Sequence, residues 1–252
     1  MSNKVGILIL HGIGKQKTNY SSDLQKGILK SIGNTDKQVI FHEVLYSQLF
    51  DDYARKRSQY LMDSSHPLQL VERFIRYMLI YFFSDATSYK DKNGYNATHE
   101  YLSSELAVFK QKLDADSPII VATHSMGAMV ISDYVYDEQK GMTGKTAIAK
   151  NLRAFITFAC NIPLFEMGHN KTVSIEKPTD EFIWQNFFSP FDVLGYKVDG
   201  YYDEEYNHAG NRPQFIKDFK IFPGGLLKSW NVLSHTCYWE YKDIHDAIGR
   251  II

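Results

Sequence analysis

The sequence lacks an excess of charge of either sign, and it lacks a long apolar run. Its 28 lysines and arginines against 29 aspartates and glutamates give a net charge of -1, which offers no broad attraction for the phosphates of nucleic acid. The longest apolar run, residues 77–83, is far shorter than the roughly 20 residues that a membrane-spanning helix needs. The run at 5–10 is too short for the core of a signal peptide. We therefore expect a cytoplasmic protein with no nucleic-acid partner and no transmembrane segment.

Cysteine is also scarce, and histidine lacks the spacing of a metal site. The two cysteines, Cys160 and Cys237, each lie beside apolar or aromatic residues, which does not indicate a disulfide framework. The nine histidines show no spacing suited to zinc. We expect a reduced protein whose chemistry needs no metal.

Apolar and aromatic side chains, by contrast, are abundant. They make up 44% and 14% of the residues, which is well outside the composition of disordered chains. A chain of 252 residues fits one large α/β domain with a single sheet. We predict one domain spanning residues 1–252.

Short apolar runs alternate with amphipathic segments along the chain. A continuous apolar run such as 5–10 is typical of a strand buried on both faces. Strands are expected at 5–10, 39–46, 117–122, 152–159, 181–187 and 215–222. Helical spacing occurs between them, at 21–30, 68–83, 97–113, 128–138 and 238–252. This alternation predicts a mostly parallel central sheet flanked by helices.

The segment 48–96 is less regular and is a candidate helical cap inserted over the sheet. Within it, five apolar side chains recur at three- and four-residue steps: Leu70, Phe74, Tyr77, Met78 and Tyr81. The aromatic stretch 77–83 suits an apolar pocket for an acyl chain. It equally suits a helix that faces the core of its own domain, so both interpretations stay open.

The strongest local motif is Thr123-His124-Ser125-Met126-Gly127, between a predicted buried strand and a predicted helix. A serine on such a sharp strand-to-helix turn has its hydroxyl lifted clear of the sheet, which requires small residues two positions away on either side. Gly127 meets this requirement, whereas Thr123 is larger than the usual glycine. The motif predicts that Ser125 is a nucleophile.

Two backbone N–H groups are candidates for an oxyanion hole, which stabilises the negative oxygen of a tetrahedral intermediate. Met126 opens the helix after Ser125, where free N–H groups and the helix dipole favour negative charge. A second donor is expected from the glycine-containing loop that follows the first strand. There we assign the N–H of Ile13, with that of Gly12 as the less favoured alternative.

A serine nucleophile needs a base, and His235 is the preferred candidate. In nucleophile-elbow enzymes the chain order is serine, acid, histidine, and His169, His208, His235 and His245 lie downstream of Ser125. His235 falls in a loop between the last predicted strand and the final helix. His245 lies within that helix, and His208 lies in a loop rich in acidic residues.

The acid that orients the base is predicted to be Asp192. It follows the predicted strand 181–187 and is surrounded by apolar residues, where an unpaired carboxylate would be costly. An ordinary turn-capping role after Ser189-Pro190 is the alternative. Asp199 and Asp203 are close enough in sequence to compete for the same role.

These segments resemble those of bacterial lipase/esterase-like α/β-hydrolases, and the resemblance spans nearly the whole chain. It is carried by Ile7–Gln16, His124–Gly127, Phe155–Phe165, Asp192–Tyr196 and Ser234–Trp239. The resemblance implies an α/β-hydrolase fold and a triad of Ser125, His235 and Asp192. It implies no cofactor.

The function expected from these residues is hydrolysis of a carboxylic ester through an acyl-enzyme, with a small-molecule ester or lipid-like substrate. Acyl transfer to another acceptor, or thioester cleavage, would use the same residues. A catalytically retired scaffold that binds a ligand or partner is the alternative from a different class.

Overall fold

A six-stranded sheet lies at the centre of the computed structural model, which describes residues 2–14, 16–50, 52–63, 70–142, 146–167, 175–201, 215–225 and 232–252. The strands lie in the order β2-β1-β3-β4-β5-β6, and each neighbouring pair is parallel. Their bounds are β1 (Lys4–Leu10), β2 (Gln38–Val44), β3 (Ile119–His124), β4 (Leu152–Phe158), β5 (Ile183–Phe188) and β6 (Ile216–Lys220). The predicted parallel α/β architecture is confirmed.

The central strands contribute side chains to two cores, one on each face of the sheet. Leu8 of β1 and its partner Val121 of β3 belong to one cluster of buried side chains, while the adjacent pair Ile7 and Ile120 belongs to the other. Every residue of β3 is buried. This two-sided burial is the reason why these strands are continuously apolar in sequence rather than alternating.

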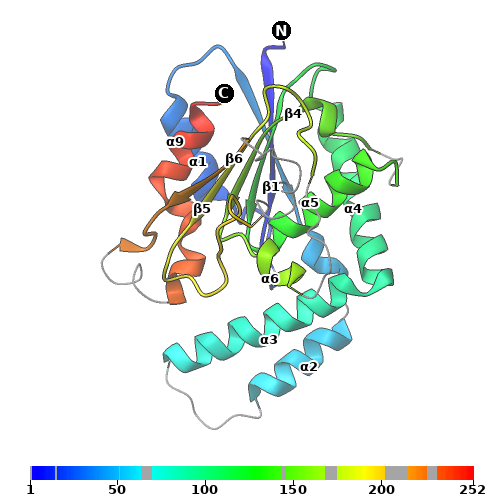
Figure 1. Ribbon diagram of the computed structural model, residues 1–252, viewed down its shortest axis with the longest axis vertical. Coiled ribbons are helices and arrows are strands. Elements are labelled where there is room, and N and C mark those ends of the chain that lie inside the picture. The colour runs from blue at the N-terminus through cyan, green and yellow to red at the C-terminus, as the bar shows by residue number, and fades with distance from the viewer. Residues whose placement is uncertain are drawn as a thin grey trace.

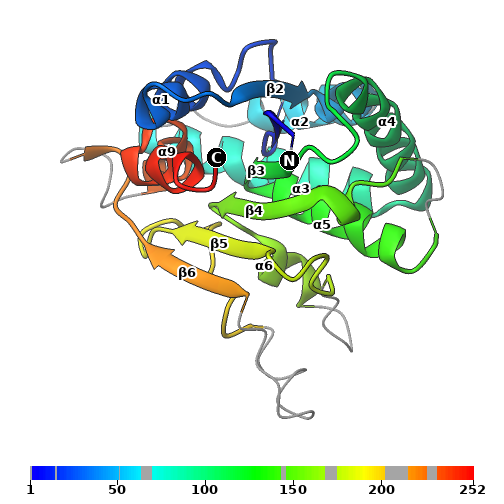
Figure 2. The same cartoon turned by 90° about the horizontal axis from the view of Figure 1, so that it is seen from above.

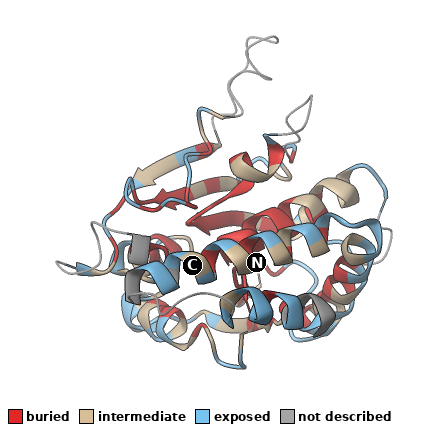
Figure 3. Ribbon diagram, turned by 90° about the horizontal axis from the view of Figure 1, so that it is seen from below, coloured by how far each residue is buried: buried red, intermediate tan, exposed pale blue. Residues whose placement is uncertain are grey.

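Helices cover both faces of the sheet (Figures 1 and 2). On one side lie α1 (Ser22–Ile32) and α9 (Lys242–Gly249), and on the other α4 (Lys92–Gln111) and α5 (Met126–Gln139). Figure 3 shows the resulting pattern, with buried strands inside and helices exposed on their outer sides. The remaining described elements are η1 (Tyr46–Leu49), α2 (Asp52–Asp63), α3 (Leu70–Lys90), η2 (Ala149–Asn151), α6 (Ile162–Glu166), η3 (Val232–Thr236) and η4 (Tyr238–Glu240).

The segment 48–96 includes α2, α3 and the start of α4. Helix α3 lies beside the edge of the sheet that is formed by the carboxyl ends of the strands (Figure 1). Met78 of the predicted stripe and the nearby Phe82 are buried in the same cluster as Leu8 and Val121, whereas Tyr77 of the stripe is 37% exposed. Leu79 and Phe83 are 45% and 61% exposed, so the other side of the helix is not covered. The side chains of Leu70 and Phe74 lie outside the described residues. None of the described helices has the length and apolar character required to span a membrane.

The turn from β3 into α5 passes very close to the end of β1. A Cβ atom added to Gly127 would lie 2.5 Å from the carbonyl oxygen of His11 and 2.7 Å from Oγ1 of Thr123. Real Cβ atoms do not approach other atoms this closely. The glycine is therefore required by contact with β1, in addition to the needs of the turn itself.

We predict that Gly127→Ala lowers the free energy of unfolding by about 1–3 kcal/mol, because the added methyl group must push β1 and α5 apart. Gly200→Ala is the matched control, since a Cβ there would meet nothing within 4 Å. Urea denaturation of the two variants measures the difference. Equal stability of the two variants would contradict the proposed contact.

Candidate active site

Ser125 has a backbone conformation that is rare for any residue other than glycine. Its φ is 52° and its ψ is -124°, at the N-cap of α5. Such a conformation costs about 1–3 kcal/mol and persists only where the surroundings hold it. The Ser125 N–H donates to the carbonyl of Phe158 at 3.0 Å, and the Ser125 carbonyl accepts from the Ala128 N–H at 3.0 Å. This geometry is that of a nucleophile elbow.

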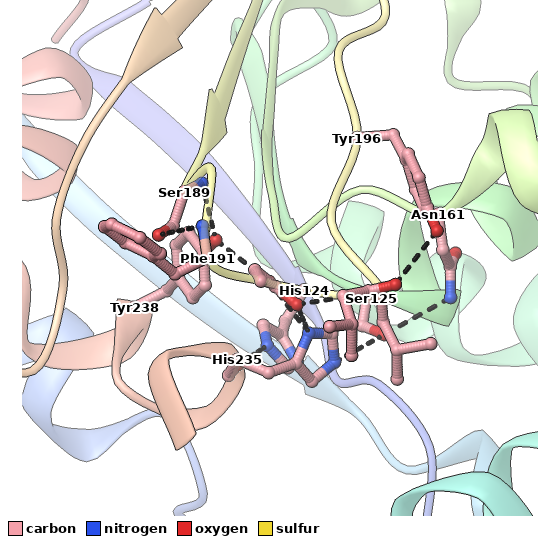
Figure 4. Close-up of polar contacts among 11 residues, drawn as sticks. His124, Ser125, Asn161, Ser189, Phe191, Tyr196, His235 and Tyr238 are labelled. Carbon is pink, nitrogen blue, oxygen red and sulfur yellow. Dashed lines mark hydrogen bonds and ion pairs between the residues drawn. The ribbon is translucent and has the colours of Figure 1, made fainter. Parts of the chain in front are cut away.

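Three side chains far apart in the sequence meet at this turn (Figure 4). His235 Nε2 lies 3.1 Å from Ser125 Oγ, and His235 Nδ1 lies 2.8 Å and 2.9 Å from the two carboxylate oxygens of Asp192. His235 belongs to η3, and Asp192 lies in the loop after β5. All three residues are buried. The predicted nucleophile, base and acid thus form one continuous line of hydrogen-bonding groups.

Asp192 is held as a carboxylate by the groups around it. Burial opposes its charge, but the His235 imidazole, the Leu194 N–H and the Tyr238 hydroxyl together outweigh burial and keep the pKa of Asp192 below its usual value. The last two groups donate to the carboxylate at 2.9 Å each. Because Nδ1 of His235 faces a carboxylate, it carries the ring hydrogen, and Nε2 is left to accept the Ser125 proton.

Of the competing residues that the structure describes, His245 has its Nε2 on the carbonyl of Trp239 at 2.8 Å. Asp192 faces His235 Nδ1, and Asp199 lies beside Asp218, whose carboxylate accepts the Asp199 N–H at 3.2 Å. Asp203, His169 and His208 lie outside the described residues.

The loop after β1 lies against Ser125. A Cβ added to Gly12 would be 2.9 Å from Ser125 Cβ, so only glycine allows this approach. Tyr46 donates to the carbonyls of His11 at 2.6 Å and Gly12 at 3.3 Å. The Ile13 N–H belongs to the same trans peptide as the Gly12 carbonyl, so it points away from Tyr46.

Helix α3 also fixes this loop, because the Gly14 N–H donates to the buried carboxylate of Asp85 on α3 at 2.6 Å. Because the Gly14 N–H already donates to Asp85, it is not a candidate donor for an oxyanion. Among the N–H groups of this loop, those of Gly12 and Ile13 remain the candidates for an oxyanion hole.

The sequence did not reveal three residues that support the site. His124 contacts the His235 carbonyl through Nε2 at 2.7 Å, and Tyr238 bridges the Ser189 N–H and Asp192. Asn161 lies beside Ser125 Oγ at 3.3 Å. All three stand inside stretches that carry the family resemblance, but the direction of a side chain cannot be read from the sequence there. Among the described residues, no group of three or more histidine, cysteine or acidic side chains is arranged to hold a metal ion.

Comparisons with known proteins give only remote similarities. No protein-family model and no curated protein sequence matches the chain. Est1E from Butyrivibrio proteoclasticus is 12% identical over 98% of this chain and 86% of its own, with a TM-score of 0.45. A structure of YahD with malic acid is 14% identical over 93% and 91%, with a TM-score of 0.44. A Xanthomonas campestris pv. campestris protein classed with the alpha/beta superfamily of hydrolases is 10% identical over 86% and 87%, with a TM-score of 0.42.

Similarities this remote carry no argument about activity. The α/β-hydrolase fold is instead visible in the chain's own strand order, with Ser125 following β3, Asp192 following β5 and His235 following β6. A parallel sheet brings the carboxyl ends of these strands to one edge.

We predict that Tyr238→Phe lowers the free energy of unfolding by about 1–3 kcal/mol, because the Ser189 N–H loses its buried partner. The Asp192 carboxylate also loses a donor, so its pKa rises in the variant. A depressed carboxyl pKa contributes stability that is lost as pH falls from the unfolded pKa to the folded pKa, so the raised folded pKa of the variant makes this loss smaller and completes it at a higher pH. Chemical denaturation between pH 3 and 7 measures both effects.

The control for Tyr238→Phe is Tyr134→Phe, which removes a hydroxyl bonded to the Thr146 carbonyl. An identical pH profile for the two variants would contradict the prediction.

Buried His124 generates a second pH dependence. Burial, followed by the nearby His235, lowers the pKa of His124 from 6.5 to about 3. Between these values the unfolded chain binds a proton that the folded protein does not, so stability falls as pH decreases below 6.5. His124→Gln removes the proton that this histidine takes up on unfolding. We therefore predict that the free energy of unfolding changes with pH less steeply in the variant, by about 1.4 kcal/mol per pH unit. Unfolding measured at pH 6, 5 and 4 tests this, and an unchanged slope would rule out a neutral buried His124.

Proposed function

We propose that this protein is a serine hydrolase that cleaves a carboxylic ester through an acyl-enzyme. The observation that supports this most is the unbroken line from Asp192 through His235 to Ser125 at a strained strand-to-helix turn. Serine is a weak nucleophile near neutral pH unless a base removes its proton, and this line supplies the base and its orienting acid.

In the first half of the reaction, Ser125 Oγ attacks the ester carbonyl carbon and forms a new C–O bond. The hydroxyl proton moves to His235 Nε2, and the carbonyl π pair moves to the carbonyl oxygen. When the intermediate collapses, the alcohol leaves and takes the proton from His235. Water then releases the acyl group by the same steps. Asp192 stays charged throughout and stabilises the imidazolium.

The developing oxyanion requires preorganised donors. We assign the N–H groups of Met126 and Ile13, with Gly12 as the alternative to Ile13. Met126 opens α5 and lies directly after the nucleophile. Tyr46 donates to the carbonyls of both His11 and Gly12, so the N–H groups of Gly12 and Ile13 both point away from Tyr46. These bonds support this loop as the source of the second donor without favouring either N–H.

The substrate class we propose is a small-molecule ester or a lipid-like ester. A cavity of about 850 Å³ is lined by residues of η1, α2, α3 and α4, some apolar, such as Leu61 and Phe83, and some polar, such as Arg57, but its lining includes none of the triad. It is therefore not assigned as the acyl pocket. Acyl transfer and thioester cleavage would use the same groups. Because Ser125 is completely buried, the alternative function is that of a catalytically inactive scaffold that binds a ligand or partner.

Labelling with a fluorophosphonate probe distinguishes the enzyme from the scaffold. We predict that the wild-type protein is modified at Ser125 and that Ser125→Ala and His235→Ala abolish labelling. Asp192→Asn should lower ester turnover by about 10⁴-fold, because the imidazole then adopts the wrong tautomer. Ser132→Ala, in the same helix and buried, is the control that should keep full activity. Folded wild-type protein that is neither labelled nor able to hydrolyse p-nitrophenyl esters would establish the scaffold instead.

A further inference from the structure

Asn161 directs its side chain to the nucleophile instead of to its own helix. It occupies the N-cap position of α6, with φ of -115° and ψ of 13°, yet makes no side-chain cap bond. Asparagine at this position ordinarily caps the helix with its side-chain oxygen. Here the carboxamide is completely buried and its terminal polar atom lies 3.3 Å from Ser125 Oγ (Figure 4).

The backbone before Asn161 is strained in a way that sets this direction. Ala159 has a φ of 53° although it is not glycine. Its N–H donates to the Phe187 carbonyl at 3.1 Å, and the Cys160 carbonyl accepts from the Tyr196 N–H at 2.7 Å. The peptide before Ala159 and the peptide between Cys160 and Asn161 are thus held by neighbouring segments. Strain of this kind concentrates at functional sites.

The carboxamide of Asn161 has two orientations, in which its oxygen and nitrogen exchange places. In the one that satisfies both ends, Nδ2 donates to the Ser125 carbonyl at 3.1 Å, and Oδ1 accepts from the Met126 N–H at 3.3 Å. Oδ1 also lies 3.3 Å from Ser125 Oγ, where it is a second acceptor, besides His235 Nε2, for the one hydrogen of that hydroxyl. In the other, Nδ2 faces Ser125 Oγ. In both, a polar atom of Asn161 stands between the nucleophile and the proposed oxyanion donor of Met126.

Substrate changes which orientation is favoured. Once the Ser125 proton has moved to His235 and the oxyanion has taken the Met126 N–H, Oδ1 has lost both of its donors and faces a negative charge. Rotation of the amide by 180° about the Cβ–Cγ bond places Nδ2 there instead. We infer that Asn161 is a third oxyanion donor, which acts through Nδ2 in the transition state; this rests on the proposed hydrolase function.

The test compares kcat and KM of Asn161→Ala and Asn161→Asp with the wild-type protein on a p-nitrophenyl ester. Loss of one oxyanion donor typically lowers kcat by about 10²–10³-fold, and we expect that loss in Asn161→Ala with KM changed by less than about threefold. Asn161→Asp should be no more active than Asn161→Ala at pH 8, because a carboxylate accepts but does not donate and repels the oxyanion. Relative to Asn161→Ala at the same pH, its activity should partly recover as the carboxyl group is protonated.

A trifluoromethyl ketone, which forms an anionic tetrahedral adduct with serine, provides a readout that a purely structural role would not move. Its affinity should fall in Asn161→Ala by about the factor lost in kcat/KM. Asn186→Ala removes another buried asparagine, bonded to Thr157 and Asp218, and is the control for general effects on folding. Should Asn161→Ala fail to fold, Asn161→Ser, whose hydroxyl can still donate, replaces it and should retain part of the activity.

Two results would overturn the inference while leaving the hydrolase intact. One is an Asn161→Ala variant that keeps kcat within threefold of an active wild-type protein. The other is an Asn161→Asp variant that is more active than Asn161→Ala at pH 8, which would assign the side chain as an acceptor that clamps Met126. A wild-type protein with neither turnover nor labelling of Ser125 would instead overturn both the proposed function and this inference.

Discussion

The close approach of the β3–α5 turn to the end of β1 is the constraint on which the rest of the site depends. Gly127 allows α5 to begin directly against the His11 carbonyl, and Ser125 takes up the left-handed backbone that this path demands. The same approach places Gly12 against Ser125. One steric requirement thus sets the direction of the nucleophile and the distance to the loop that carries the proposed second oxyanion donor.

Burial gives the polar groups around Ser125 their chemical states. Away from water, a carboxylate stays charged only where donors surround it, as Leu194 and Tyr238 surround Asp192. An imidazole without such a partner stays neutral, as His124 does. His235 stands between these two environments, with a carboxylate on one ring nitrogen and a hydroxyl on the other. The low-dielectric surroundings strengthen every bond in the line.

The segment 48–96 is tied to the chemistry as well as to the core. Phe82 and Met78 anchor α3 in the cluster of buried side chains that also contains Leu8. The Asp85 carboxylate holds the loop after β1 through the Gly14 N–H. A change in the position of α3 would therefore also move the loop residues Gly12 and Ile13. The exposed apolar side of α3 is separate from these contacts, since it is formed by other residues of the helix.

The sequence by itself determined the parallel α/β architecture, because strands buried on both faces must be continuously apolar and helices between them must be amphipathic. It also predicted Ser125, since the elbow is a local motif, and it narrowed the base and acid to loops after particular strands. Only the tertiary structure decided which loop residues meet. His124, Tyr238 and Asn161 act through side-chain direction and distance, which depend on backbone strain at Ala159 and on packing between segments 36 to 111 residues apart. Such contacts leave no periodic trace in a single sequence.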